Sequence, residues 1–79
     1  MHFLFYFTFF KDFTISFSSD GGNDVKSISR IYNSEIGELP TAIKKGYDFV
    51  SWKYNGNRIN GAKMPGHDIT LVAEWKERA

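Results

Sequence analysis

The chain contains no cysteine, so neither a disulfide bond nor a thiolate zinc site can hold it together. This absence assigns no compartment, because cytosolic proteins and many bacterial surface proteins both do without disulfides. His2 and His67 lie too far apart in the sequence to suggest a metal site. A chain of 79 residues makes one small domain, and its stability must therefore come from the burial of side chains.

The chain also lacks a large excess of positive or negative charge. Ten Lys and Arg residues face nine Asp and Glu residues, for a formal net charge of +1, and the longest cationic block is Lys44-Lys45. Nucleic-acid-binding domains usually carry a basic patch or stripe, so we expect no nucleic-acid partner. No glycine-rich phosphate loop precedes a helix, and the adjacent His67 and Asp68 would point to opposite faces of an extended chain. We therefore expect no enzyme, no catalytic residue, no metal and no cofactor.

Helical pattern is scarce as well. Only the stretch from Asn33 to Lys45 could hold a helix, with Ser34 as its cap, and Gly37 and Pro40 interrupt it. We expect at most one short helical turn or an extended crossover, with Leu39 as its buried anchor.

One long apolar run is present, at residues 2–10, and it is well short of the ~20 residues of a membrane-spanning helix. It also lacks the basic region and the small-residue cleavage site of a signal peptide. Three interpretations of residues 1–11 stay open: an additional strand, the tail of a linker, or the remnant of an export segment. Because both faces of such a strand would be apolar, we expect it to pair with the sheet edge or with the same run of a second copy, giving a homodimer.

Aromatic residues are abundant: eight Phe, four Tyr and two Trp, and each can bury ~150–250 Å². Apolar and polar residues alternate with a period of two over residues 13–17 and 69–75, which predicts strands with one buried face. Residues 49–54 are predicted to form a further aromatic-rich strand, which follows a turn at Gly46-Tyr47. Residues 25–32 alternate less clearly, since each of the two faces carries apolar residues. Turns are predicted at Asp20-Gly21-Gly22 and at Asn55-Gly56. The predicted core consists of Phe13, Ile15, Phe17, Phe49, Trp52, Ile69, Leu71 and Trp75.

Three groups of residues are candidates for binding. The predicted hairpin tip combines hydrogen-bonding and charged groups, a composition that loops use for recognition, although a solvated turn has the same composition. Its residues are Tyr54, Asn55, Asn57 and Arg58. Trp52 and Trp75 could form a platform for a sugar or a cation, but their apolar strand neighbours favour a place in the core. A weak basic face for anionic polysaccharide would use Lys44, Lys45, Lys53, Arg58 and Lys63.

Several separately placed aromatic and turn residues resemble the pattern of the Listeria–Bacteroides repeat, the module found as the B repeat of internalin B. The matching positions, in order, are Phe17, Gly21, Gly22, Tyr32, Leu39, Pro40, Gly46, Tyr47, Phe49, Trp52, Met64, Pro65, Thr70, Leu71, Ala73 and Trp75. The departures are Asp20 for Asn, Asn33 for Gly, Ala42 for Pro and Ser51 for Gly. Asp and Asn tolerate left-handed backbone, so the first two are mild, while Ser51 puts a side chain where the family has none.

The resemblance implies a mainly β, β-grasp-like small mixed sheet over residues 12–76, followed by a tail at residues 77–79. It implies a non-enzymatic repeat module of a bacterial surface or secreted protein, acting as a spacer, an adhesion domain or a partner-binding domain for protein or cell-surface glycan. Two alternatives remain: a free-standing ubiquitin-like adaptor that binds protein through its sheet edge, and a polysaccharide-binding module. No transmembrane segment is expected.

Overall fold

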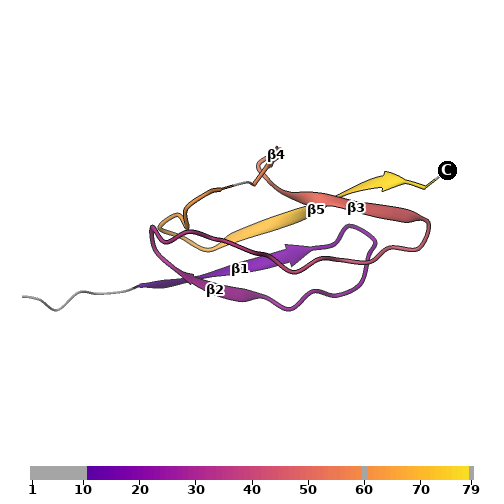
Figure 1. Cartoon of the computed structure of the whole chain (residues 1–79). Helices are drawn as coiled ribbons and strands as arrows, with labels where there is room; N and C mark the ends of the chain where they lie inside the picture. Colours follow the sequence, from indigo (N-terminus) through magenta and orange to yellow (C-terminus); the bar gives the residue numbers. More distant parts are fainter. Residues whose placement is uncertain (1–10, 60, 79) are drawn as a thin grey trace, which may run out of the picture.

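The computed structural model describes residues 11–59 and 61–78 (Figure 1). Five strands account for the regular structure of this part of the chain: β1 (Asp12–Ser18), β2 (Ile28–Ile31), β3 (Tyr47–Tyr54), β4 (Asn57–Arg58) and β5 (Ile69–Glu77). No helix occurs within these residues, which confirms the mainly β prediction. The predicted strand and dimer contact of residues 1–10 lie outside the described residues.

The strands form one mixed sheet with the order β2-β1-β5-β3-β4. The first and last strands, β1 and β5, are parallel neighbours at its centre, with Ile15 opposite Ile69 and Ser18 opposite Val72. The other three pairings are antiparallel. Because β1 and β5 run in the same direction, the chain enters at one end of the sheet and leaves at the other (Figure 1).

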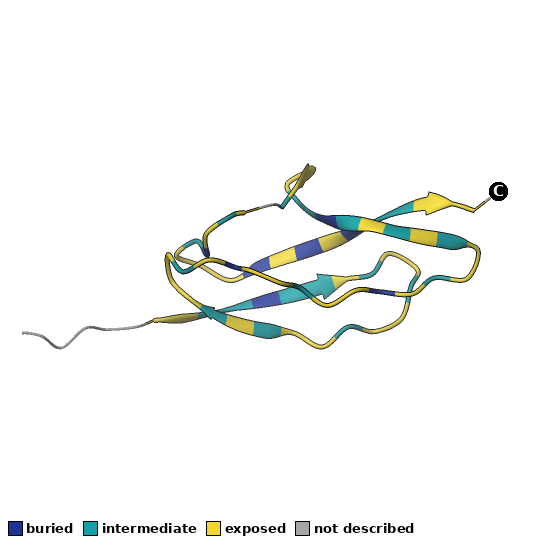
Figure 2. Cartoon of the chain, viewed as in Figure 1, coloured by how far each residue is buried: buried dark blue, intermediate teal, exposed yellow. Residues whose placement is uncertain are grey.

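One face of the sheet carries the core, and buried residues alternate with exposed ones along the first part of β5, while β1 has one buried residue, Ile15, between half-buried ones (Figure 2). Four of the predicted core residues are buried: Ile15, Trp52, Ile69 and Leu71. The other four are only half-buried and pack against these, namely Phe13, Phe17, Phe49 and Trp75. Four further buried residues were not in the predicted core: Ile36, Ala42, Met64 and Ala73. The half-buried aromatic rings thus surround a smaller centre that consists of aliphatic side chains and Trp52.

A β-bulge in β3 places Phe49 and Trp52 together on the core face. Phe49 lies opposite Trp75 and Ser51 lies opposite Glu74, so Val50 is an extra residue without a partner on β5. A strict period of two would put Phe49 and Trp52 on opposite faces, since they are three residues apart. The extra residue restores them to one face, where their ring centroids are 5.1 Å apart.

The stretch between β2 and β3 is an extended crossover, the second of the two predicted forms. Its buried residues are Ile36 and Ala42, while Leu39, the predicted anchor, packs against the core half-buried. The indole N–H of Trp52 donates to the carbonyl oxygen of Pro40 at 2.7 Å. Arg30 on β2 donates from Nε to the carbonyl oxygen of Ile36 at 2.8 Å. Side chains of the sheet therefore hold the crossover over the core in the absence of helical hydrogen bonds.

The strand predicted over residues 25–32 is shorter in the structure, where β2 covers Ile28–Ile31. Ile28 is half-buried and packs against the core, whereas the side chain of Ile31 is 40% exposed. The core face of β2 is therefore the face of Ile28, a choice that the sequence left open.

Two turns show why the departures from the repeat pattern are tolerated. Asp20 and Asn33 have φ angles of 51° and 64°, in the left-handed region that Asp and Asn adopt more readily than other non-glycine residues. At the β3–β4 hairpin, Asn55 and Gly56 have φ angles of 52° and 82°, as a two-residue turn between Tyr54 and Asn57 requires. The predicted hairpin turn is confirmed.

Candidate functional site

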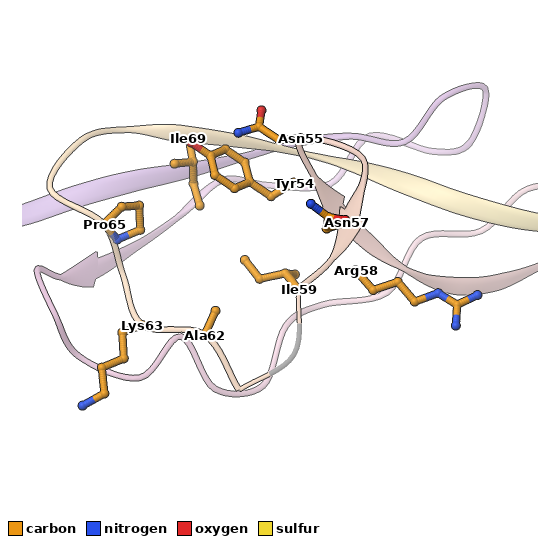
Figure 3. Close-up of a pocket in the computed structure, with 9 residues that line it drawn as sticks. All are labelled: Tyr54, Asn55, Asn57, Arg58, Ile59, Ala62, Lys63, Pro65 and Ile69. Atoms are coloured by element: carbon orange, nitrogen blue, oxygen red, sulfur yellow. The ribbon is translucent and has the colours of Figure 1, made fainter.

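An open pocket, which we call the tip hollow, lies between the β3–β4 hairpin and the segment that follows it (Figure 3). Its volume is about 320 Å³, at the small end of the range for ligand pockets. The lining residues are Tyr54, Asn55, Asn57, Arg58, Ile59, Ala62, Lys63, Pro65 and Ile69. All four residues of the predicted hairpin-tip site lie in this lining. Of the other five, Lys63 was predicted for the weak basic face and Ile69 for the core, and no sequence pattern connected any of the five with the hairpin tip.

The interior and the rim of the tip hollow differ in character. Tyr54, Ile59 and Ile69 present apolar surface around the opening, and Ala62 points toward it from the opposite side (Figure 3). The carboxamide of Asn57 stands beside this surface and offers hydrogen-bond donors and an acceptor, while that of Asn55 lies beyond the Tyr54 ring (Figure 3). The charged ends of the two cationic side chains point away from the opening. A ligand would therefore meet an apolar wall edged by neutral polar groups.

Backbone hydrogen bonds fix the far wall of the hollow to the crossover. The amide of Ile36 donates to the carbonyl of Ala62 at 3.1 Å, and the amide of Met64 donates to the carbonyl of Ser34 at 2.8 Å. Met64 itself is 1% exposed. The hollow is thus bounded by a hairpin on one side and by a segment anchored in the core on the other.

Arg58, on β4, is already bound within the protein. Its Nε and Nη2 atoms donate to the two carboxylate oxygens of Glu74 at 2.9 and 3.1 Å. The hydroxyl of Ser51 donates to the same carboxylate at 3.1 Å, so the residue that replaces the family's glycine has gained a partner. The Arg58 hydrogen bond is the main reason why the pKa of Glu74 falls to about 2, and the same contact raises the pKa of Arg58. Because Arg58 and Glu74 neutralise each other, the pair offers little net charge to attract an ionic ligand.

The two tryptophans do not form a platform. Trp52 is 3% exposed and lies in the core. Trp75 is half-buried, and its indole N–H donates to the carbonyl oxygen of Ser19 at 2.7 Å. The cation over its ring belongs to the chain itself, since Lys44 Nζ lies 5.7 Å from the ring centroid and 3.1 Å from the carbonyl oxygen of Asp20. Lys44 and Arg58, two members of the predicted basic face, are therefore held by intramolecular contacts.

No group of three His, Asp or Glu side chains that could hold a metal ion occurs in the described residues. Across residues 11–59 and 61–78, the structure contains no helix with the length and apolar character needed to cross a membrane.

The fold and the tip hollow define a small all-β module with a mixed sheet and turn-rich loops. The sequence model of the Listeria-Bacteroides repeat domain matches residues 13–74, and the chain belongs to this family. The family is a non-catalytic repeat family that occurs in surface proteins.

Two relatives come from Evansella cellulosilytica. A "Putative Gly-rich membrane protein" is 31% identical over 84% of this chain and 8% of its own length. A "Putative membrane protein" is 30% identical over 81% of this chain and 10% of its own length. The chain thus spans about a tenth of the curated relatives that it matches, and it corresponds to a module-sized segment of each.

Proposed function

We propose that this chain is a non-enzymatic spacer module of a bacterial surface or secreted protein. The observation that carries the proposal is the parallel pairing of the first and last strands, which puts the two ends of the sheet at opposite ends of the module. From the register of Ile15 with Ile69, Asp12 and Glu77 are separated by eleven residue steps along the strand direction, or about 36 Å. Modules with this geometry add length when they are joined in series.

The relatives support this role, because the matched segment is a small fraction of each and both names describe membrane proteins. The strand order with its central parallel pair supports the β-grasp-like arrangement, here with an extended crossover in place of a helix. We propose residues 12–76 as the module, with β5 continuing as far as Glu77 into the short tail of residues 77–79, and residues 1–11 as a separate segment.

Small-angle X-ray scattering of one, two and three copies joined in series tests the spacer role. We expect the longest dimension to increase by at least about 36 Å with each copy, since the ends of each module lie that far apart. Side-by-side packing of the copies, with little increase in length, would contradict it. The same samples report whether a single copy is a dimer, as expected if residues 1–10 pair between chains, and deletion of those residues should then give a monomer.

A second role, adhesion, is favoured by the tip hollow. We propose that the hollow takes one pyranose unit of a cell-surface polysaccharide. The ring of Tyr54 offers a flat apolar wall, and the carboxamide of Asn57 matches a sugar hydroxyl as donor and acceptor. The volume of about 320 Å³ suits one ring better than an extended peptide. Because Arg58 is bound to Glu74, a neutral sugar is favoured over an anionic one.

Titration of the full chain with cellotetraose, chitotetraose and tetragalacturonate, followed by NMR, tests this role. We expect a neutral tetrasaccharide to shift the side-chain amide of Asn57 and the ring of Tyr54. Ala62→Leu should abolish the shifts by filling the hollow, whereas Ala62→Ser should keep them. If only tetragalacturonate causes shifts, and a higher salt concentration abolishes them, the ligand is an anionic sugar and the proposal of a neutral sugar is wrong. No shift with any of the three would overturn the adhesion proposal and leave the spacer role intact.

A further inference from the structure

The two strands that receive any pull on the chain are the two strands that pair at the centre of the sheet. β1 follows directly after residue 11, and β5 ends at Glu77, one residue before Arg78. Tension applied through the two ends draws β1 toward its own start and β5 toward its own end. Since the strands are parallel, these are opposite directions along one shared line of hydrogen bonds.

This geometry loads the β1–β5 hydrogen bonds together. The register covers four residue pairs, from Ile15 with Ile69 to Ser18 with Val72. Hydrogen bonds that run across the pull must all fail before the strands can slide, whereas a hairpin pulled at its open end loses them one after another. Resistance to the pull is therefore shared along the whole contact.

Side chains lengthen the contact at both ends. Before β5 begins, the carboxylate of Asp68 accepts a hydrogen bond from the backbone amide of Thr14 at 2.8 Å. After β1 ends, the carbonyl of Ser19 accepts the indole N–H of Trp75 at 2.7 Å. Both bonds connect a residue on or next to β1 with a residue on or next to β5. They would also have to break before sliding.

Sliding would in addition pull the aliphatic centre apart. Ile15 on β1 and Leu71 on β5 are both 0% exposed, and Ile69 is 4% exposed. Moving β1 along β5 by one residue turns every side chain of one strand toward the wrong face. The sheet therefore opposes sliding with buried apolar surface as well as with hydrogen bonds.

We propose that the module is a load-bearing element, in which the paired β1 and β5 act as a shear clamp against tension along the chain. The proposal rests on the spacer role in one respect, the assumption that neighbouring parts of a longer protein pull on both ends. The two can fail separately, because the scattering experiment measures added length and the experiment below measures resistance to force.

Single-molecule force spectroscopy of the full chain between marker domains tests the proposal. Pulling through the chain ends should give one cooperative unfolding event that releases about 195 Å of contour length, the extended length of residues 12–77 less the folded span. The comparison geometry pulls through cysteines introduced by Lys11→Cys and Tyr32→Cys. These residues are neighbours, since the Tyr32 amide donates to the Lys11 carbonyl at 2.8 Å, and a pull between them unzips β1 from β2.

We expect an unfolding force several-fold greater for the chain ends than for the Lys11–Tyr32 pair. Asp68→Ala should lower the unfolding force for the chain ends and leave the force for the Lys11–Tyr32 pair unchanged. The variant removes only the bond from the Thr14 amide, which belongs to the clamp. Asp24→Ala, on an exposed residue outside the clamp, should change neither. Equal forces in the two geometries would overturn the proposal. So would an Asp68→Ala effect of the same size in both, which would show a general loss of stability.

Discussion

A Cβ atom added to Gly22 would stand 2.8 Å from Cζ2 of Trp75 and 2.8 Å from the carbonyl oxygen of Ile43. Gly22 is thus the point where the loop after β1, the crossover and the end of β5 come into contact. Its requirement for glycine is steric, because its φ angle is not among the positive ones. The hydrogen bond from Trp75 to Ser19 lies in the same contact.

Gly22→Ala is therefore expected to lower the free energy of unfolding by about 1–3 kcal/mol, as overpacking does. The matched control is Gly37→Ala. Gly37 has a φ of 69° with no atom near its added Cβ, so only the left-handed backbone is strained. Urea denaturation measures both costs, and the indole N–H resonance of Trp75 separates them: it should move in Gly22→Ala and stay in place in Gly37→Ala. An unmoved resonance in both would show that Trp75 does not pack on Gly22.

The two tryptophans should differ in their contribution to stability. Trp52→Ala removes a ring that is 3% exposed and should cost about 3–5 kcal/mol, enough to unfold much of a small domain. Trp75→Ala should cost less, because its ring is only half-buried. Chemical denaturation of the two variants provides the comparison, and a larger loss for Trp75→Ala would reverse the assignment of the core.

Gly46 has a φ of 84°, in the left-handed region that disfavours residues other than glycine. Gly46→Val should cost about 1–3 kcal/mol, since a β-branched residue is strained there. Ser51→Gly restores the residue of the repeat pattern, but it removes the hydrogen bond to Glu74 and loosens the backbone, so we expect a loss of about 0.5–2 kcal/mol. Thermal melts rank the two. A stabilising Ser51→Gly would mean that the serine is tolerated in the bulge without contributing to it.

The Glu74 carboxylate gives the module a defined response to acid. Its pKa in the folded protein is about 2, below the ordinary value of 4.5, so the folded state favours the ionised form. The stability from this group is present in full above about pH 4.5 and is lost as the pH falls toward 2. NMR titration of the side-chain carboxyl should show the low pKa.

Arg58→Met should raise the pKa of Glu74 toward 4.5, while Lys53→Met should change it little because Lys53 is the smallest cause of the shift. An unshifted pKa in Arg58→Met would disprove the role of Arg58.

The local patterns of the sequence predicted the strands and turns whose signals are self-contained. The alternation of residues 69–75 defined β5, and Asn55-Gly56 defined the hairpin, because both depend on neighbours in the chain. Parallel pairing of β1 with β5 has no local signal. The burial of Ile36 and Met64 also depends on a contact between segments almost thirty residues apart, and short irregular segments carry no periodicity that would reveal it.

Only part of the candidate site was predicted, again because sequence patterns indicate contacts between neighbours in the chain and not contacts between distant segments. Tyr54, Asn55, Asn57 and Arg58 were found because a turn brings them together locally. The opposite wall of the hollow, at Ala62 and Pro65, is placed by backbone bonds to the crossover, which no pattern within the hairpin could indicate. The partner of Arg58 was missed as well, because Glu74 meets it only after β3, β4 and β5 have assembled.

The parallel arrangement of β1 and β5 also limits how this module can be re-engineered. Many domains have neighbouring termini and accept circular permutation or insertion into a host loop. Here a segment joining Glu77 back to Asp12 would have to cross about 36 Å, which takes at least about eleven extended residues. A shorter joint would compress the sheet along its length. The module is therefore suited to fusion in line with its neighbours, and a permuted version needs a long added linker to fold.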